Sequence, residues 1–425
     1  MQLRTFWIRK GKREMRKALA LILGIMLALG SVPAMCEGPV EIELWHYFES
    51  SNDKVMMEQL VEAYNDLQDR VHITAAYISR QEMMRRYAIG AISGELPDIG
   101  MVDSPDMAAY ISLGLFIDIT EPLKDWGELD HFYPGPLQSC MDADGRLYGL
   151  PQNTSCLCLA VNTDLLGRAG YDHPPRSREE FEAMARATTD ADSGVYGFAM
   201  SCIGTEEGTF QLLPWLRAGG INVDDLTAPS AVENLAMLGG LMRDGVMSRE
   251  CVGWNQADAW YSFCAGKAAM VECGTWHLSM TGDIGDRFNY DFCLLPTGAD
   301  GESSSTIGGE NFGLCAGCAD EAGCLAFLEW LCDAENETAW SVGAGKIPPR
   351  DDCTVTYPYE QRGFETFADE MRFAQARGPH PEWPAISEAV WTACQAVFVD
   401  DADPAEALAG AMERIAPIIA ENPLP

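Results

Sequence analysis

The stretch VEIELWH, residues 40–46, decides the fold, because it is the first of three strand-like segments separated by helix-like ones. Apolar and polar residues alternate in it, as they do in a β-strand with one buried face. The segments VHITAAYI (71–78) and DIGMV (98–102) also read as strands. This β-α-β-α-β order predicts a parallel sheet with right-handed crossovers, whose ligands bind beyond the carboxyl ends of the strands. Those ends are Trp45-His46-Tyr47 and Asp103-Ser104.

The same alternation continues beyond residue 145, which predicts a second α/β unit. Strands are expected at 156–162, 268–272 and 290–295, and one helix at 231–243. A second helix should follow the capping box of Ser177 and Glu180, and a third should follow the cap residue Asp403. A chain of 425 residues is too long for one compact core and suits two lobes. Because no long low-complexity linker is present, we expect short crossings between the lobes.

The net charge disfavours one class of partner. The chain carries 29 Lys and Arg against 64 Asp and Glu, which gives a net charge of −35 at pH 7. Nucleic-acid binding needs a basic surface, so no nucleic-acid partner is expected. Such an acidic surface keeps an exported protein soluble, and an acidic site for a cationic ligand is the other interpretation.

Residues 1–34 have the pattern of a secretory signal peptide. Basic residues precede an apolar run at 18–29, and the small, helix-breaking stretch 30–34 follows. The run is shorter than the roughly 20 residues that span a bilayer. We therefore expect an exported protein, extracellular or periplasmic and associated with the cell envelope. Cys36 follows the cleavage site in a poor lipid-attachment context, so a lipid anchor there is disfavoured.

The mature chain contains no sequence motif for catalysis, cofactor binding or metal binding. Of its cysteines, Cys315, Cys318, Cys324 and Cys332 form the one cluster that looks metal-like. A second Cys-x-x-Cys and a nearby His are missing, which favours buried thiols or disulfides over zinc. We therefore expect no cofactor and no metal. The paired carboxylates of a secreted carbohydrate hydrolase remain an alternative, because a sequence does not give their separation.

Tryptophan is the most informative residue type for a binding function, because its ring can stack on the apolar face of a sugar. Six tryptophans lie near predicted strand ends or Gly- and Pro-rich turns: Trp45, Trp215, Trp254, Trp260, Trp276 and Trp383. Large aromatic residues more often pack in cores or between lobes. Trp276 is the exception, because it follows a strand and Gly274, where a close turn would direct the ring into a cleft.

Further short motifs follow one another in a characteristic order. They are GELPD (94–98), GLFIDI (114–119), GRLYGLP (145–151), NTDLL (162–166), FCAGKAAM (263–270) with Gly274 and Trp276, IPPR (347–350) and PAEAL (404–408). With these motifs, the chain from about Val40 to Ile415 resembles the extracellular solute-binding proteins of ABC importers. The resemblance is to the sugar-type group that includes maltodextrin-binding proteins.

The resemblance implies an α/β, two-lobed periplasmic-binding-protein-like fold of type II. Its hinge crossings would lie near 153–156, 308–311 and 348–350, and its lobes would comprise 37–153 with 311–348, and 154–310 with 349–425. Closure of the lobes would capture a solute without chemistry, and the closed form would deliver it to the membrane permease subunits. The protein would act as a monomer without catalytic residues.

Carried over onto this sequence, the resemblance implies a site for a mono- or oligosaccharide. Trp276 would stack on a sugar ring, and Asp103 would accept hydrogen bonds from sugar hydroxyls. The other residues implied are Trp45, His46, Glu49, Asn153, Trp215, Trp254, Glu310, Asn311, Arg350 and Trp383. For Arg350, pairing with an acid is the competing role.

The ligand subclass stays open at this point. Ala160 and Val161 stand where many relatives have aromatic residues, which removes one stacking surface. A different small solute, such as a polyamine, is the alternative within binding proteins. The hydrolase is the alternative from another class, and a structural or adhesive role is the third.

Overall fold

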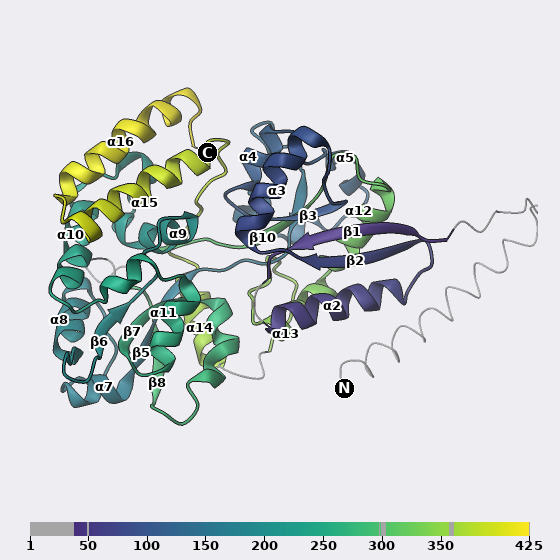
Figure 1. Cartoon of the computed structure of the whole chain (residues 1–425). Coiled ribbons are helices and arrows are strands. Elements are labelled where there is room, and N and C mark those ends of the chain that lie inside the picture. Colours follow the sequence, from purple (N-terminus) through teal and green to yellow (C-terminus); the bar gives the residue numbers. More distant parts are fainter. Residues whose placement is uncertain (1–37, 49–50, 297, 299–302, 357–360, 425) are drawn as a thin grey trace, which may run out of the picture.

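The computed structural model describes residues 38–48, 51–296, 298, 303–356 and 361–424. In it the chain forms two lobes, each built on its own β-sheet (Figure 1). The predicted signal peptide, Cys36 and Glu49 lie outside the described residues. None of the described helices has the length and apolar character needed to cross a membrane.

The first lobe contains a five-stranded sheet in the order β2-β1-β3-β10-β4. Its strands are β1 (Val40–His46), β2 (Val71–Tyr77), β3 (Ile99–Asp103), β4 (Gly149–Pro151) and β10 (Glu310–Leu314). β1 pairs in parallel with β2 and β3, which confirms the parallel sheet predicted from residues 40–102. β10 returns from far along the chain and pairs antiparallel with β3.

Helices cover both faces of this sheet. They are α2 (Ser51–Asn65), α3 (Arg80–Ser93), α4 (Met107–Ser112), α5 (Thr120–Leu123), α6 (Pro134–Gln138), α12 (Glu321–Leu331) and α13 (Ala334–Ala344). One face of β1 contributes Ile42 and Leu44 to a core that includes Met57 of α2 and Trp340 of α13. The other face contributes Trp45 to a smaller core with Tyr87 of α3.

The second lobe contains a four-stranded sheet in the order β6-β7-β5-β8. Its strands are β5 (Leu157–Asn162), β6 (Tyr196–Ala199), β7 (Ala268–Gly274) and β8 (Tyr290–Cys293). Its helices are α7 (Thr163–Arg168), α8 (Arg178–Thr188), α9 (Glu206–Leu216), α10 (Pro229–Arg243), α11 (Gln256–Cys264), α14 (Gln361–Glu370), α15 (Trp383–Asp400) and α16 (Pro404–Glu421). α15 packs against α9, α10 and α16, on the side of the lobe that also meets α4 (Figure 1).

The crossings between the lobes lie together. Isolated antiparallel bridges join Thr154 to Ile347 and Ser155 to Gly308. Gly309 has a φ of 143°, and a Cβ at this position would lie 2.3 Å from the carbonyl oxygen of Asn153. Only glycine fits such a conformation and approach. The lobe boundaries named above stay a prediction.

Two predicted helix caps show how far local sequence signals hold. Asp403 caps α16, because its carboxylate accepts hydrogen bonds from the N–H groups of Ala405 and Glu406. Ser177 caps α8 by accepting from the Glu180 N–H, but the Glu180 carboxylate accepts from the Arg176 N–H. The predicted capping box is therefore only half formed, because Glu180 reaches one residue further back than Ser177.

Candidate functional site

The site begins at the edge of the first sheet where β1 and β3 end. Asp103 is the last residue of β3, and Tyr47 directly follows β1. Because β10 runs antiparallel to β3, its first residue, Glu310, lies opposite Asp103. The buried Tyr47 hydroxyl has no hydrogen-bond partner among the described residues. Burial and the nearby Glu310 and Asp103 charges raise the pKa of Tyr47. Three oxygen-bearing side chains therefore gather at this edge.

Arg80, the first residue of α3, partly neutralises these acids. Its Nη2 donates to Oδ2 of Asp103 at 2.7 Å and lies 3.5 Å from Oδ2 of Asp106. Burial raises the pKa of Asp106 to about 7, although the Arg80 charge opposes the shift. Burial also raises the pKa of Glu310. The charge of the site therefore changes near neutral pH.

Arg377 reaches the same carboxylate from the second lobe. Its Nη2 donates to Oδ1 of Asp103 at 2.7 Å and its Nη1 donates to Oδ2 at 3.1 Å, which makes a bidentate pair. Nη1 also donates to Oε1 of Glu206, the first residue of α9, at 2.6 Å. The other Glu206 oxygen accepts from Nε1 of Trp383 at 3.0 Å. A polar network thus runs from β3 to α9 and α15, across the boundary between the lobes.

Aromatic rings of the second lobe lie next to this network. The Arg377 guanidinium lies 4.4 Å from the ring centroid of Phe210, and the Phe210 centroid lies 6.1 Å from that of Trp276. Trp276 is half-buried, and its ring folds back over Gly274, where a Cβ would lie only 2.1 Å from the ring. Glycine at position 274 therefore permits the Trp276 orientation. An aromatic face and hydrogen-bonding side chains lie next to each other here, as sugar recognition requires.

A small pocket with a cavity volume of about 10 Å³, partly open to solvent, adjoins the network. The residues that line this pocket include the segment 376–378 and Ser104, Ser139, Asn153, Ile307, Gly308 and Asn311. The Asn311 Nδ2 donates to Oγ of Ser139 at 3.0 Å. The Asn153 side chain hydrogen-bonds Glu310. The structure therefore brings the predicted residues Asp103, Asn153, Glu310 and Asn311 together.

Three other predicted binding residues lie in cores. Trp215 is fully buried, and its Nε1 donates to Oε2 of Glu272 at 3.0 Å. Trp45 is buried beneath α3 with its ring stacked on Tyr87. His46 is buried on the opposite face of β1, where burial lowers its pKa to about 4. The structure therefore places these three rings in packed cores, and their contact with a solute stays a prediction.

The remaining tryptophans divide between two roles. Trp383 is fully buried at the start of α15 and donates its N–H to Glu206. Its contact with a solute stays a prediction. Trp254 is half-buried against the second-lobe core, and its contact with a solute stays a prediction.

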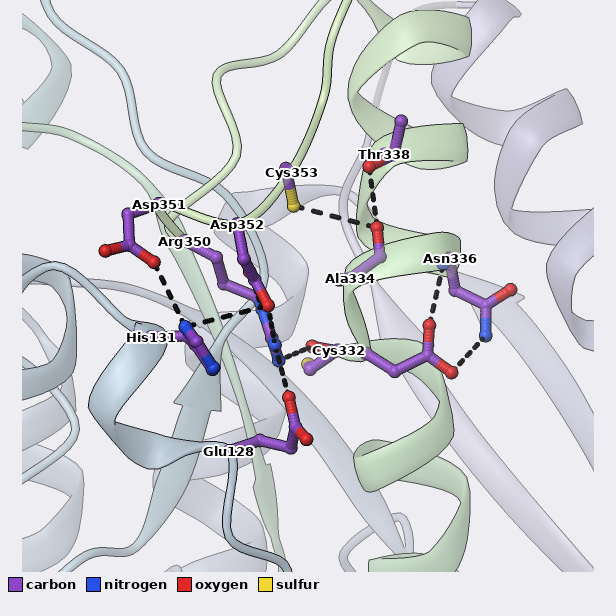
Figure 2. A network of polar contacts seen from close by, with 11 residues as sticks. Glu128, His131, Cys332, Ala334, Asn336, Thr338, Arg350, Asp351, Asp352 and Cys353 are labelled. Atoms are coloured by element: carbon purple, nitrogen blue, oxygen red, sulfur yellow. Dashed lines mark hydrogen bonds and ion pairs between the residues drawn. The ribbon is translucent and has the colours of Figure 1, made fainter.

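Arg350 has the structural role that competed with solute binding (Figure 2). Its side chain is fully buried and donates to both carboxylate oxygens of Asp352, to Glu128 and to the backbone oxygen of Cys332, at 2.6 to 2.9 Å. This network fixes the third crossing to the first lobe. Glu128, His131 and Asp352 bring possible metal-ligating atoms within 4.8 Å of one another. The guanidinium already neutralises two of these carboxylates, so the cluster carries no metal assignment.

Five residues of the network were missed at the level of sequence: Tyr47, Arg80, Asp106, Glu206 and Arg377. A signal existed for the first three. Tyr47 directly follows β1, Arg80 lies three residues after the end of β2, and Asp106 lies three residues after Asp103. Glu206 and Arg377 had no such signal, because only the folding of the second lobe brings them to Asp103.

Comparison with known proteins identifies the family. A model of the bacterial extracellular solute-binding proteins matches residues 59–366. The galactooligosaccharide-binding protein of Bacillus subtilis (strain 168) is 25% identical over 395 residues, which cover 88% of each chain.

Solved structures share the fold. An ABC transporter solute-binding protein of Thermotoga lettingae bound with alpha-D-tagatose has a TM-score of 0.79 at 20% identity, covering 89% of this chain and 100% of that one. The maltose-bound MalE3 of T. maritima has a TM-score of 0.77 at 19% identity, covering 89% of this chain and 99% of that one. Because the family model matches well over half of the residues, this chain belongs to the bacterial extracellular solute-binding protein family.

Proposed function

We propose that this protein is the receptor of an ABC importer for a mono- or oligosaccharide, which it binds between its two lobes. One observation carries the proposal: the half-buried Trp276 lies against Phe210, whose ring contacts Arg377 in a network of carboxylate, amide and hydroxyl groups that comes from both lobes. Aromatic faces suit the C–H faces of sugars, and carboxylates and amides suit their hydroxyls.

Named relatives support the carbohydrate class. The Bacillus subtilis relative is described as a galactooligosaccharide-binding protein, and the two structural relatives hold tagatose and maltose. Trp276 would stack on a sugar ring, and Asp103, Asn153 and Glu310 would bind its hydroxyls. The protein would act outside the cytoplasmic membrane and pass the sugar to the permease subunits.

A polyamine is the weaker alternative on electrostatic grounds. A cationic solute needs unpaired carboxylates, but Asp103 and Glu206 already bind arginine side chains. A polyamine would have to displace Arg377 from a site where that side chain is only 3% exposed. A neutral polyol would compete with Arg377 for hydrogen bonds to Asp103 but would not have to replace its charge.

A hydrolase is disfavoured by the same contacts. Asp103 and Glu206 are the acids that approach each other from the two lobes, and Arg377 binds both. A guanidinium stabilises the ionised carboxylate, whereas a general acid must hold a proton at neutral pH. Asp106 has a raised pKa, to which the Glu206 charge of the second lobe contributes, but Glu206 itself is bound by Arg377.

The test is a thermal-shift screen of the mature chain against sugars, polyols, amino acids and polyamines, with product analysis of every hit. A ligand at about 100 times its dissociation constant adds roughly 2.7 kcal/mol to the free energy of unfolding. We expect stabilisation by a saccharide that is recovered unchanged. Stabilisation by cations alone would favour the polyamine, and consumption of the sugar would favour the hydrolase.

A further inference from the structure

The cysteine cluster at positions 315, 318, 324 and 332 does not converge on one point. Cys315 follows β10 and is buried in the smaller core with Tyr87, whereas the other three cysteines pack in the core on the opposite face of the first sheet. In the described part of the chain, no three of these sulfur atoms lie within 4.8 Å of one another. A structural zinc ion takes four ligands at one point, so the arrangement leaves only contacts between pairs of thiols.

Cys318 and Cys324 form such a pair. Cys318 lies in the loop between β10 and α12, and Cys324 is the fourth residue of α12. The Cys324 thiol donates a hydrogen bond to the Cys318 sulfur, so the two side chains are in contact. Cys324 is fully buried, whereas Cys318 is half-buried and packs against the same core. One thiol of the pair is therefore accessible from solvent, and the other is reached only through it.

The segment between these two cysteines is anchored to its surroundings. The Ala319 N–H donates to Oδ1 of Asp98 at 2.6 Å. The Arg70 Nη2 donates to both carboxylate oxygens of Asp320 at 2.9 Å, and the Cys324 N–H donates to the backbone oxygen of Asp320 at 2.9 Å. Folding thus brings the two thiols together and holds them there, which favours a bond between them.

A second pair of contacting thiols shows what distinguishes the first. Cys156 and Cys158 share a hydrogen bond, but both are fully buried in the second lobe, where an external oxidant has no access. They also lie two residues apart in the extended strand β5. Such Cα atoms are about 6.6 Å apart, close to the upper limit for a disulfide. Accessibility and position therefore single out Cys318 with Cys324.

We propose that Cys318 and Cys324 are a redox site that closes to a disulfide outside the cytoplasm, where this family acts and where disulfides persist. The Cys318 thiolate attacks one sulfur of an external disulfide, and the other external sulfur leaves as a thiolate. Cys324 then loses its proton and attacks the Cys318 sulfur, which releases the second external thiolate. The protein pair loses two electrons and two protons, and the external disulfide is reduced to two thiols.

Two features of the pair suit this order of attack. The hydrogen bond from Cys324 lowers the pKa of Cys318, which raises the thiolate fraction of the accessible thiol. The disulfide would fasten the loop after β10 to the start of α12. β10 begins at Glu310 in the candidate site and ends at Leu314, so the pair lies beyond its far end. The proposal therefore goes beyond solute binding and does not rest on it.

The experiment incubates the folded mature protein, without solute, in excess oxidised or excess reduced glutathione. After acid quenching, remaining thiols are blocked in denaturant, and peptides are mapped by mass spectrometry without reduction. Cleavage after Glu321 separates the two cysteines. In oxidised glutathione we expect the linked peptides to exceed the dithiol at least about tenfold. Cys353 is the matched control, because it is also half-buried but donates to the backbone oxygen of Ala334, and it should form no link within the chain.

Two variants test the order of attack. Cys324→Ser should trap Cys318 as a mixed disulfide with glutathione, because the second thiol is missing. Cys318→Ser should leave Cys324 as a free thiol, because Cys324 is buried. Free thiols at both positions of the wild-type protein in oxidised glutathione would overturn the proposal, as would a link from either one to a different cysteine. The wild-type mapping stays decisive if a variant does not fold, and it does not depend on whether the protein binds a saccharide.

Discussion

The Trp276 side chain is where a single residue bears most directly on solute affinity. Trp276→Ala removes an aromatic face beside the polar network, and aromatic contacts contribute about 0.5–1.5 kcal/mol beyond the area they bury. We expect the dissociation constant for a bound saccharide to rise about tenfold, measured by titration calorimetry. Trp330→Ala is the matched control, because Trp330 is also half-buried but packs on Tyr64 and Phe327 of the first lobe. An equal loss of affinity in both variants would contradict this assignment.

Asp106 makes a prediction about pH. Its pKa is raised to about 7, mainly by burial, from a reference value of 3.8. The folded state therefore holds a proton that the unfolded state has lost, so this contribution to stability is present below about pH 4 and disappears as the pH rises through 7. The free energy of unfolding of the wild-type protein should therefore fall by on the order of 2 kcal/mol between pH 5 and pH 8. Asp106→Asn should remove this fall. Urea unfolding of both proteins at both pH values measures the change. If the variant shows the same difference between pH 5 and pH 8 as the wild-type protein, the raised pKa of Asp106 is refuted.

The helix α16 depends on the capping residue directly before it. Asp403 accepts two backbone hydrogen bonds at the start of the helix, and losing such a cap costs about 1 kcal/mol. Asp403→Ala should therefore lower the free energy of unfolding by about 1 kcal/mol in urea titrations. Asp400→Ala, at the exposed end of α15, is the control and should change it by less than about 0.5 kcal/mol. Similar losses in both variants would show that the cap does not contribute.

At the scale of elements, local patterns predicted much of the fold and contact between distant segments supplied the rest. Strands β1, β2 and β3 were predictable, because each alternates or is continuously apolar between clear turns. The place of β10 in the first sheet was not, because it follows from pairing over more than 200 residues. Trp383 was predicted to lie near a strand end or a Gly- and Pro-rich turn, but it is the first residue of α15, with Pro384 in the first turn of that helix.

The residues of the candidate site were likewise predictable only in part. Asp103 was predictable, because it ends a buried strand at the edge where such sheets bind ligands. Trp45 and His46 end the neighbouring strand, yet they point into two different cores, since successive side chains alternate across a sheet. Arg377 could not be found, because its partners come from β3 and α9.

At the scale of the whole molecule, Gly309 controls how closely the crossings approach. Its φ is 143°, which other residues rarely adopt, and an added Cβ would lie 2.3 Å from the Asn153 carbonyl oxygen. Gly309→Ala should destabilise the protein by about 1–3 kcal/mol and weaken solute binding, because the crossings must separate. Gly167→Ala is the control, since no atom lies within 4 Å of an added Cβ. Unfolding and binding curves that match for the two variants would contradict this role.

The most direct test of the central claim is titration calorimetry of the mature protein with galactooligosaccharides, maltose and tagatose, followed by analysis of the recovered sugar. We expect saturable binding of one saccharide per chain, with the sugar unchanged, and weaker binding by Trp276→Ala. Binding of a polyamine with no response to any saccharide, or recovery of hydrolysed sugar, would contradict it.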